Sequence, residues 1–116
     1  MTIRRLKTYA GTQGFVYQYY FVGQRPGEKD SSTEYIFDVT SDRKRTYSVT
    51  IRVPRALLDS WSRTHLRSLS DAEQYAAVKM RLFRAFDEIE APQVGGLNLL
   101  MEEPFFQESL ASLGVD

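Results

Sequence analysis

Few residues in this chain have side chains suited to acid–base chemistry, and a single histidine is the first of them. His65 is the only imidazole in the sequence, and beside Asp59 or Asp71 it would be able to act as a general base. It also lies where a helix is expected to end, a position at which the helix dipole favours a protonated imidazole. We expect this structural role for His65, so an enzyme of unknown class is the least favoured of three functional hypotheses.

Three acidic residues, Asp87, Glu88 and Glu90, lie near the expected end of a long helix. The helix dipole disfavours acidic side chains at this end, so helix stability alone does not explain them. One interpretation is a solvated helix end in which Glu88 pairs with Arg84 one turn earlier. The alternatives are a docking surface for a basic partner and a weak Mg²⁺ or Ca²⁺ site on the face that Asp87 and Glu90 share. We keep the three acids as candidate partner-binding residues.

A basic segment, Arg43, Lys44 and Arg45, follows an expected strand. A basic tip on a small sheet can enter a DNA groove, and aromatic sheet faces can stack single-stranded bases. The order of three strands and a helix over residues 15–66 resembles small sheet-based DNA-binding domains of the integrase N-terminal and AP2 types, in element order only. The resemblance implies nucleic-acid binding through these three residues. Nucleic-acid-binding domains are usually basic, so the isoelectric point near 6.6 disfavours this function. We keep it as the first alternative to an interaction protein.

The composition excludes several other kinds of chemistry. The chain has no cysteine, which excludes disulfides, thiol catalysis and cysteine-ligated metals. Gly95-Gly96 lacks the Lys-Ser/Thr pair and the preceding strand of a phosphate-binding loop. The apolar runs fall far short of the ~20 residues of a membrane helix, and the first residues lack the apolar core of a signal peptide. We therefore expect a cytoplasmic protein with no membrane partner, catalytic residue, cofactor or metal.

The net charge of zero conceals an uneven distribution of charge along the sequence. Residues 1–67 contain twelve Lys or Arg against six Asp or Glu, whereas residues 68–116 contain three against nine. The first part therefore carries +6 and the second −6. Such a split indicates a charged partner, two oppositely charged surfaces that meet in a dimer, or neutralisation within one molecule.

The elements that must position these residues begin with three strands. Aromatic and β-branched residues alternate over residues 15–22, 34–40 and 46–53, with the period of two that is typical of strands. Residues 4–9 are expected to add a short edge strand. Both faces of the first strand are apolar, and its inner face joins those of the next two strands in a predicted aromatic core. That core consists of Phe15, Tyr17, Tyr19, Phe21, Tyr35, Phe37 and Tyr47.

The pairing of the second and third strands follows from parity, because opposed residues of an antiparallel pair point to the same face. Pairing Phe37 with Val49 satisfies this rule and leaves residues 41–45 as a loop. The same register places Glu34 opposite Arg52 on the outer face. We predict a surface ion pair between them, worth about 0.5 kcal/mol.

Helices are expected over the second half of the chain. Pro54 fits the first position of a helix, and Ser70 with Glu73 forms a capping box before a long helix over Asp71–Glu90. Gly95-Gly96 predicts a mobile linker. Residues 104–113 are expected to form a short last helix. The expected fold is α+β in a single domain, 1–116. It consists of an antiparallel meander of three strands, or of four with the edge strand (1–53), two helices packed on one face (54–90), and the linker with its short C-terminal helix (91–116).

Helices on one face leave the other face of the sheet without a cover. Tyr20 and Ile36 are apolar residues of that outer face, and a patch of this kind usually marks a contact surface. We therefore predict a small non-catalytic interaction or structural accessory protein that forms a homodimer or binds another protein. Its contacts are expected at the outer sheet face and in the acidic C-terminal third, through Tyr20, Ile36, Asp87, Glu88 and Glu90.

Overall fold

A computed structural model describes residues 6–27, 31–88 and 96–115. Within these ranges, the chain forms one sheet of five strands and three helices. The elements in chain order are β1 (Lys7–Ala10), β2 (Val16–Pro26), β3 (Thr33–Thr40), β4 (Tyr47–Val53), α1 (Arg55–His65), α2 (Asp71–Glu88), β5 (Leu97–Leu100) and α3 (Glu103–Ser112). The α+β class predicted from the sequence is confirmed.

The sheet has the strand order β1-β2-β3-β4-β5. The first four strands form an antiparallel meander, and the short edge strand expected before β2 is present as β1. After α1 and α2, the chain returns to the sheet and β5 pairs in parallel with β4. The prediction of a linker was therefore wrong over Leu97–Leu100, because pairing with β4 converts this segment into a fifth strand.

The register predicted for β3 and β4 is confirmed. Phe37 is opposite Val49, and Glu34 is opposite Arg52 on the outer face. The Glu34 carboxylate also accepts a hydrogen bond from Nε of Arg25 on β2, at 2.8 Å. Arg52 is thus the neighbour of Glu34 across the strand pair, as predicted, and the carboxylate forms an ion pair with Arg25. An ion pair between Glu34 and Arg52 stays a prediction.

The helices begin where their sequences indicate. Pro54 is the N-cap of α1, one position earlier than predicted, because its extended backbone lies just outside the helix. The capping box is confirmed: Glu73 N donates to Ser70 Oγ at 3.1 Å, and Ser70 N donates to a Glu73 carboxylate oxygen at 2.9 Å. Arg67 donates two further hydrogen bonds to this carboxylate. The Arg67 guanidinium and the Ser70 amide lower the pKa of Glu73 to about 2.

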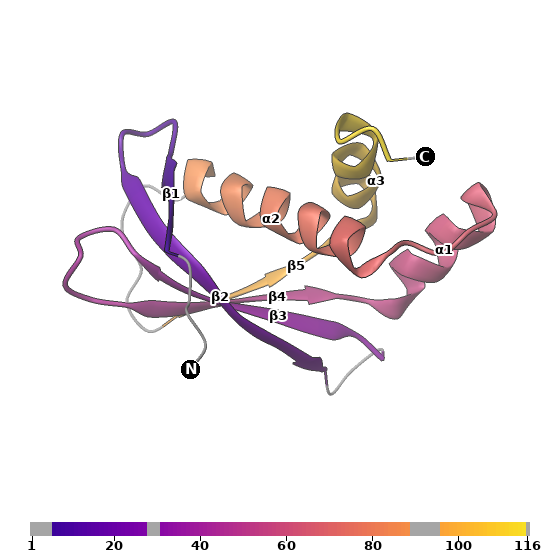
Figure 1. Ribbon diagram of the computed structural model, residues 1–116, viewed down its shortest axis with the longest axis horizontal. Helices are drawn as coiled ribbons and strands as arrows, with labels where there is room; N and C mark the ends of the chain where they lie inside the picture. The colour runs from indigo at the N-terminus through magenta and orange to yellow at the C-terminus, as the bar shows by residue number, and fades with distance from the viewer. Residues whose placement is uncertain (1–5, 28–30, 89–95, 116) are drawn as a thin grey trace.

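All three helices lie on the same side of the sheet (Figure 1), and the core is the layer between them. Leu82 and Phe86 of α2, Trp61 of α1 and Leu110 of α3 are buried against the inner strand residues. Most of the predicted aromatic core is buried or half-buried, but the Phe21 side chain remains 36% exposed. The predicted end of the long helix, residues 89–90, and most of the predicted linker lie outside the described residues.

Candidate functional surface

None of the three helices in the described part of the chain crosses the opposite face of the sheet (Figure 1). Because opposed residues share a face, the strand register defines which side chains this outer face carries. They are Val16, Gln18, Tyr20 and Arg25 of β2, Glu34, Ile36, Asp38 and Thr40 of β3, Ser48, Thr50 and Arg52 of β4, and Asn98 and Leu100 of β5.

Tyr20 and Ile36, the two residues predicted for this surface, both lie on it and are half-buried. Tyr20 faces Asp38 across the β2–β3 pair and donates its hydroxyl to the Asp38 carboxylate at 2.8 Å. Ile36 lies opposite Thr50 near the middle of the sheet. The centre of the outer face therefore combines an aliphatic side chain, a phenol and short polar groups.

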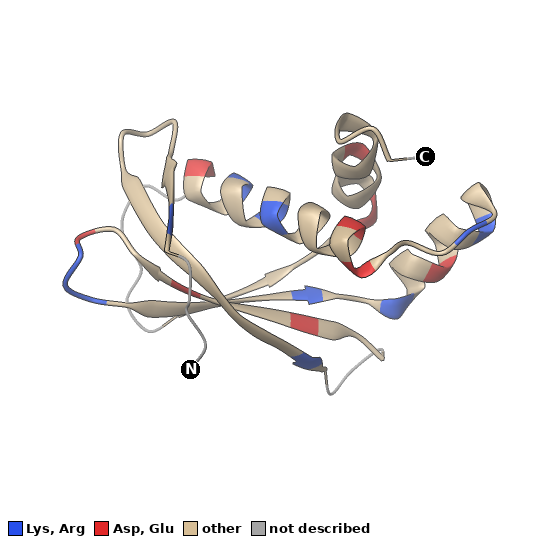
Figure 2. Ribbon diagram, in the orientation of Figure 1, with Lys and Arg blue, Asp and Glu red and all other residues tan. Residues whose placement is uncertain are grey.

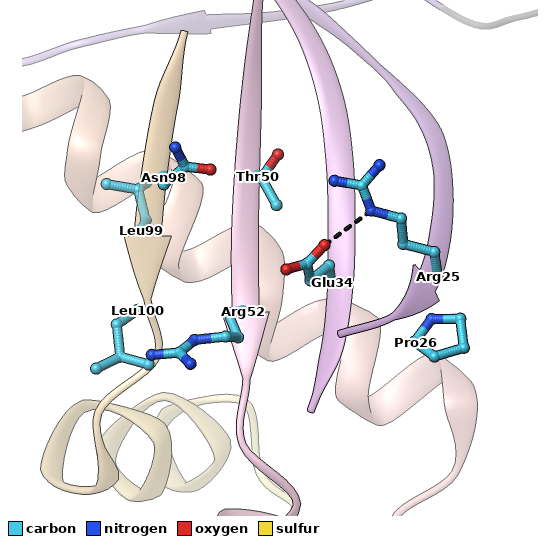
Figure 3. Close-up of a pocket in the computed structure, with 8 residues that line it drawn as sticks. All are labelled: Arg25, Pro26, Glu34, Thr50, Arg52, Asn98, Leu99 and Leu100. Atoms are coloured by element: carbon cyan, nitrogen blue, oxygen red, sulfur yellow. Dashed lines mark hydrogen bonds and ion pairs between the residues drawn. The ribbon is translucent and has the colours of Figure 1, made fainter. Parts of the chain in front are cut away.

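A hollow of about 680 Å³ crosses one end of this face (Figure 3). Side chains of β2 to β5 line it, and the helices lie behind the strands in this view. Arg25 and Glu34 form an ion pair on one side of the hollow, while Arg52 and Leu100 lie on the other. Thr50 and Asn98 contribute short polar groups further along β4 and β5.

The charges of the outer face are balanced, unlike those of the two halves of the sequence. On its described part, the charged residues are Arg25 and Arg52 against Glu34 and Asp38. The half-buried apolar residues alternate with these charges instead of forming one continuous apolar patch.

Asp87, predicted to bind a partner, is bound within the chain. Its carboxylate accepts hydrogen bonds from the Tyr9 hydroxyl at 2.9 and 3.1 Å and from the Thr12 amide at 3.1 Å. Burial raises the pKa of Tyr9, and the adjacent carboxylate raises it further. Asp87 thus joins the end of α2 to β1 and to the turn that follows it.

The neighbouring acid Glu88 forms an exposed ion pair with Arg84 Nε at 2.7 Å, one turn earlier in α2. This pair agrees with the interpretation of a solvated helix end. Glu90, the third acid of the group, lies outside the described residues. A role of any of these acids in binding a partner remains a prediction.

The basic segment forms the tip of the β3–β4 hairpin, where Figure 2 shows a run of blue beside one acidic residue. That residue, Asp42, accepts hydrogen bonds from the amides of Lys44 and Arg45 at 2.8 and 2.9 Å. These amides lower the pKa of Asp42. The turn is thus fixed by its own carboxylate, and Arg43, Lys44 and Arg45 are exposed.

His65 ends α1, as expected for a structural histidine. Its Nδ1 donates to the carbonyl oxygen of Trp61 at 3.0 Å, and its ring stacks on the Trp61 ring at 4.1 Å. Asp59, one of the two acids considered as its partner, forms an ion pair with Arg55. The structure therefore gives His65 two structural contacts, and the question of catalysis remains untested.

Sequence reasoning missed the residues that line the hollow at the β5 side. Asn98 and Leu100 reach the outer face only because β5 pairs with β4. The available signal in the sequence was the apolar–polar–apolar alternation of Leu97, Asn98 and Leu99, which is too short to indicate a strand. Arg25 was missed because it lies in a segment with the composition of a turn, although β2 continues to Pro26.

Comparison with protein-family models, curated proteins and solved structures finds no match for this chain. The integrase and AP2 resemblance in element order thus gains no support, and it leaves out β1, β5 and two of the helices. Among the described residues, no helix is long and apolar enough to cross a membrane. In the same part of the chain, no group of three His, Cys, Asp or Glu side chains is placed to hold a metal ion.

Proposed function

We propose that this protein is a non-catalytic interaction protein whose outer sheet face binds a second copy of the same chain. The observation that supports this proposal is an outer face that none of the described helices covers, with Tyr20 and Ile36 near its centre. Apolar side chains held half-exposed on a rigid sheet provide the anchors that interfaces use, because little conformational entropy is lost when they are covered.

The balance of charges favours a second copy as the occupant. In a two-fold dimer the same patch meets itself, so a patch of one sign repels its partner. The outer face has two arginines and two acids, which allows opposite charges to face each other across the axis. A stable dimer buries about 800 Å² on each partner. A face along the 45 Å length of the molecule offers an area of that order.

The first prediction is that Ile36→Glu dissociates this dimer. The substitution places a carboxylate on each copy close to the proposed two-fold axis, and like charges in an interface cost several kcal/mol. We expect dimerisation to weaken at least about 100-fold, which corresponds to about 3 kcal/mol. Light scattering at about 100 μM protein measures the change as the conversion of a dimer into a monomer.

The matched control is Leu113→Glu, which adds the same charge at an exposed apolar residue at the end of α3. This variant is expected to remain a dimer. A wild-type protein that is monomeric at the same concentration, or an Ile36→Glu variant that associates as tightly as the wild type, contradicts the proposal. Circular dichroism of both variants verifies that the sheet is intact.

Nucleic-acid binding is the second candidate, and the fixed hairpin tip supports it. Because Asp42 holds the turn, the three basic side chains are presented without the cost of ordering the loop. Binding to a short DNA duplex that weakens steeply with salt, and is lost when Arg43, Lys44 and Arg45 are changed to alanine, would favour this candidate.

An enzyme remains the third hypothesis, with His65 as its only predicted acid–base group.

A further inference from the structure

A second surface lies on the helix side of the sheet, where α2 passes the strands β1 and β2. It consists of Lys7, Phe21, Tyr75, Lys79 and Phe83, and we call it the two-lysine surface. Phe21 packs edge-on against Tyr75, with ring centroids 5.0 Å apart, and is 36% exposed. Tyr75, Lys79 and Phe83 are half-buried. The aromatic core thus reaches the surface at this point.

Two ammonium groups accompany these rings. Lys79 Nζ lies 5.8 Å from the centroid of the Tyr75 ring and 5.8 Å from that of Phe83. Lys7 pairs with Tyr19 in the β1–β2 register, so its side chain is on the same side of the sheet. Partial burial lowers the pKa of Lys79, and the like charge of Lys7 lowers it further. The ring of Tyr19, the register partner of Lys7, lies 5.7 Å from the ring of Phe83, over which Lys79 lies. Two positive charges therefore accompany the same apolar surface, which favours an anionic occupant.

The arrangement of the rings limits the kind of anion. One face of Phe83 is stacked on Tyr9 with centroids 4.4 Å apart, and Tyr75 is stacked on Phe37. Lys79 lies over both rings. Nucleic-acid bases need open ring faces on which to stack, whereas aliphatic side chains can pack against ring edges and lysine methylenes. The geometry therefore favours a polypeptide over a single-stranded nucleic acid.

We propose that the two-lysine surface binds an acidic polypeptide segment of another protein. Carboxylates of the segment pair with Lys7 and Lys79, and an apolar side chain between them packs against Phe21 and Phe83. This inference is independent of the dimer proposed above, because the surface lies on the opposite side of the sheet from Ile36. The protein would thus use its two sides for different partners.

The test uses the full chain and a fluorescein-labelled peptide of alternating Glu and Leu, with binding measured by fluorescence anisotropy. A peptide with Gln in place of Glu is expected to bind about tenfold more weakly. The double variant Lys7→Gln/Lys79→Gln is expected to lose about tenfold in affinity for the acidic peptide and most of the salt dependence. The matched control Arg43→Gln/Lys44→Gln removes the same charge from the hairpin tip and is expected to bind like the wild type.

Several results would overturn this proposal. They include the absence of binding by the acidic peptide, equal loss of affinity in the two double variants, and binding that Lys7→Gln/Lys79→Gln leaves unchanged. Oligothymidylate that binds more tightly than the peptide and loses affinity in the same variant would assign the surface to nucleic acid. Self-association that is lost in Lys7→Gln/Lys79→Gln but retained in Ile36→Glu would make a second copy the occupant.

Discussion

Replacing Phe86 with alanine is expected to lower the free energy of unfolding by about 3–5 kcal/mol, the usual cost of truncating a fully buried phenylalanine. Phe86 is buried beneath the β1–β2 hairpin. Its ring is stacked on Tyr17 with centroids 4.2 Å apart, and those of Tyr19 and Tyr9 are 6.0 and 5.8 Å away. The substitution removes ring contacts of α2 with three aromatic residues of two strands, while Phe83 keeps its contacts with Tyr9 and Tyr19.

Urea denaturation, monitored by far-UV circular dichroism, measures this decrease in the free energy of unfolding. Because domains of this kind are stable by only about 5–15 kcal/mol, the variant is expected to unfold at a much lower urea concentration than the wild type. Phe105→Ala, which truncates a half-buried phenylalanine beneath Arg84, serves as the control and is expected to cost less than half as much. Equal losses in the two variants would show that α2 is not held to the hairpin through Phe86.

The second large effect is expected from Asp87→Ala. This variant removes the acceptor for the Tyr9 hydroxyl and the Thr12 amide, and hydrogen bonds to a charged group are worth about 1.5–3 kcal/mol. Since the site is only half-buried, we expect a loss of about 2 kcal/mol in the free energy of unfolding. Glu88→Ala makes the same change of charge one residue later. It breaks only an exposed ion pair, so we expect it to cost less than about 0.5 kcal/mol.

The Tyr9–Asp87 contact also predicts a dependence on pH. The pKa of Tyr9 is raised above its ordinary value of 10.0 in the folded protein. A raised pKa means that this contribution to stability is fully present below pH 10 and is lost as the pH rises through the folded value. The stability of Asp87→Ala should therefore fall less steeply in alkali than that of the wild type. Equal urea midpoints for Asp87→Ala and Glu88→Ala would contradict the structural role.

The three acidic residues near the predicted end of the long helix show how much of a site can be predicted from local spacing. The sequence marked Asp87, Glu88 and Glu90 as a group because acids are unusual at a helix C-terminus. The structure gives Asp87 acceptor bonds to a hairpin that lies almost eighty residues earlier in the chain. A contact over this separation has no signature in local spacing. The unusual position of Asp87 was therefore visible from the sequence. The residues that donate hydrogen bonds to it, Tyr9 and Thr12, were not.

Strand patterning was the most informative part of the sequence. The alternation over β4 and the parity of opposed residues predicted the β3–β4 register correctly, because one face of that pair is apolar. The capping box of α2 was equally predictable, since its bonds join residues three apart. By contrast, β5 is four residues long and is stabilised by a distant parallel partner. The register shift between Phe21 and Gly23 likewise leaves no pattern that a period of two can detect.

The candidate surfaces were predictable only in part. Tyr20 and Ile36 were placed on the outer face by alternation alone, and the structure places them there. The two-lysine surface was missed because Phe21 alternates in phase with core residues. Its exposure depends on where α2 crosses the sheet, which is set by packing of the whole domain. Lys7 and Lys79 are likewise placed on one surface only by the tertiary structure, in which the rings of Tyr19 and Phe83 meet.

The parallel pairing of β5 also affects the order in which the chain can fold. Val49 and Leu97 are partners across the β4–β5 pair, although two helices lie between them in the sequence, whereas β1 to β4 are joined by short turns. Contacts between distant segments form more slowly because a longer loop must close. Until β5 arrives, β4 is an edge strand whose unpaired N–H and C=O groups can pair with another chain. Four residues thus determine how long the folding chain is open to misassembly.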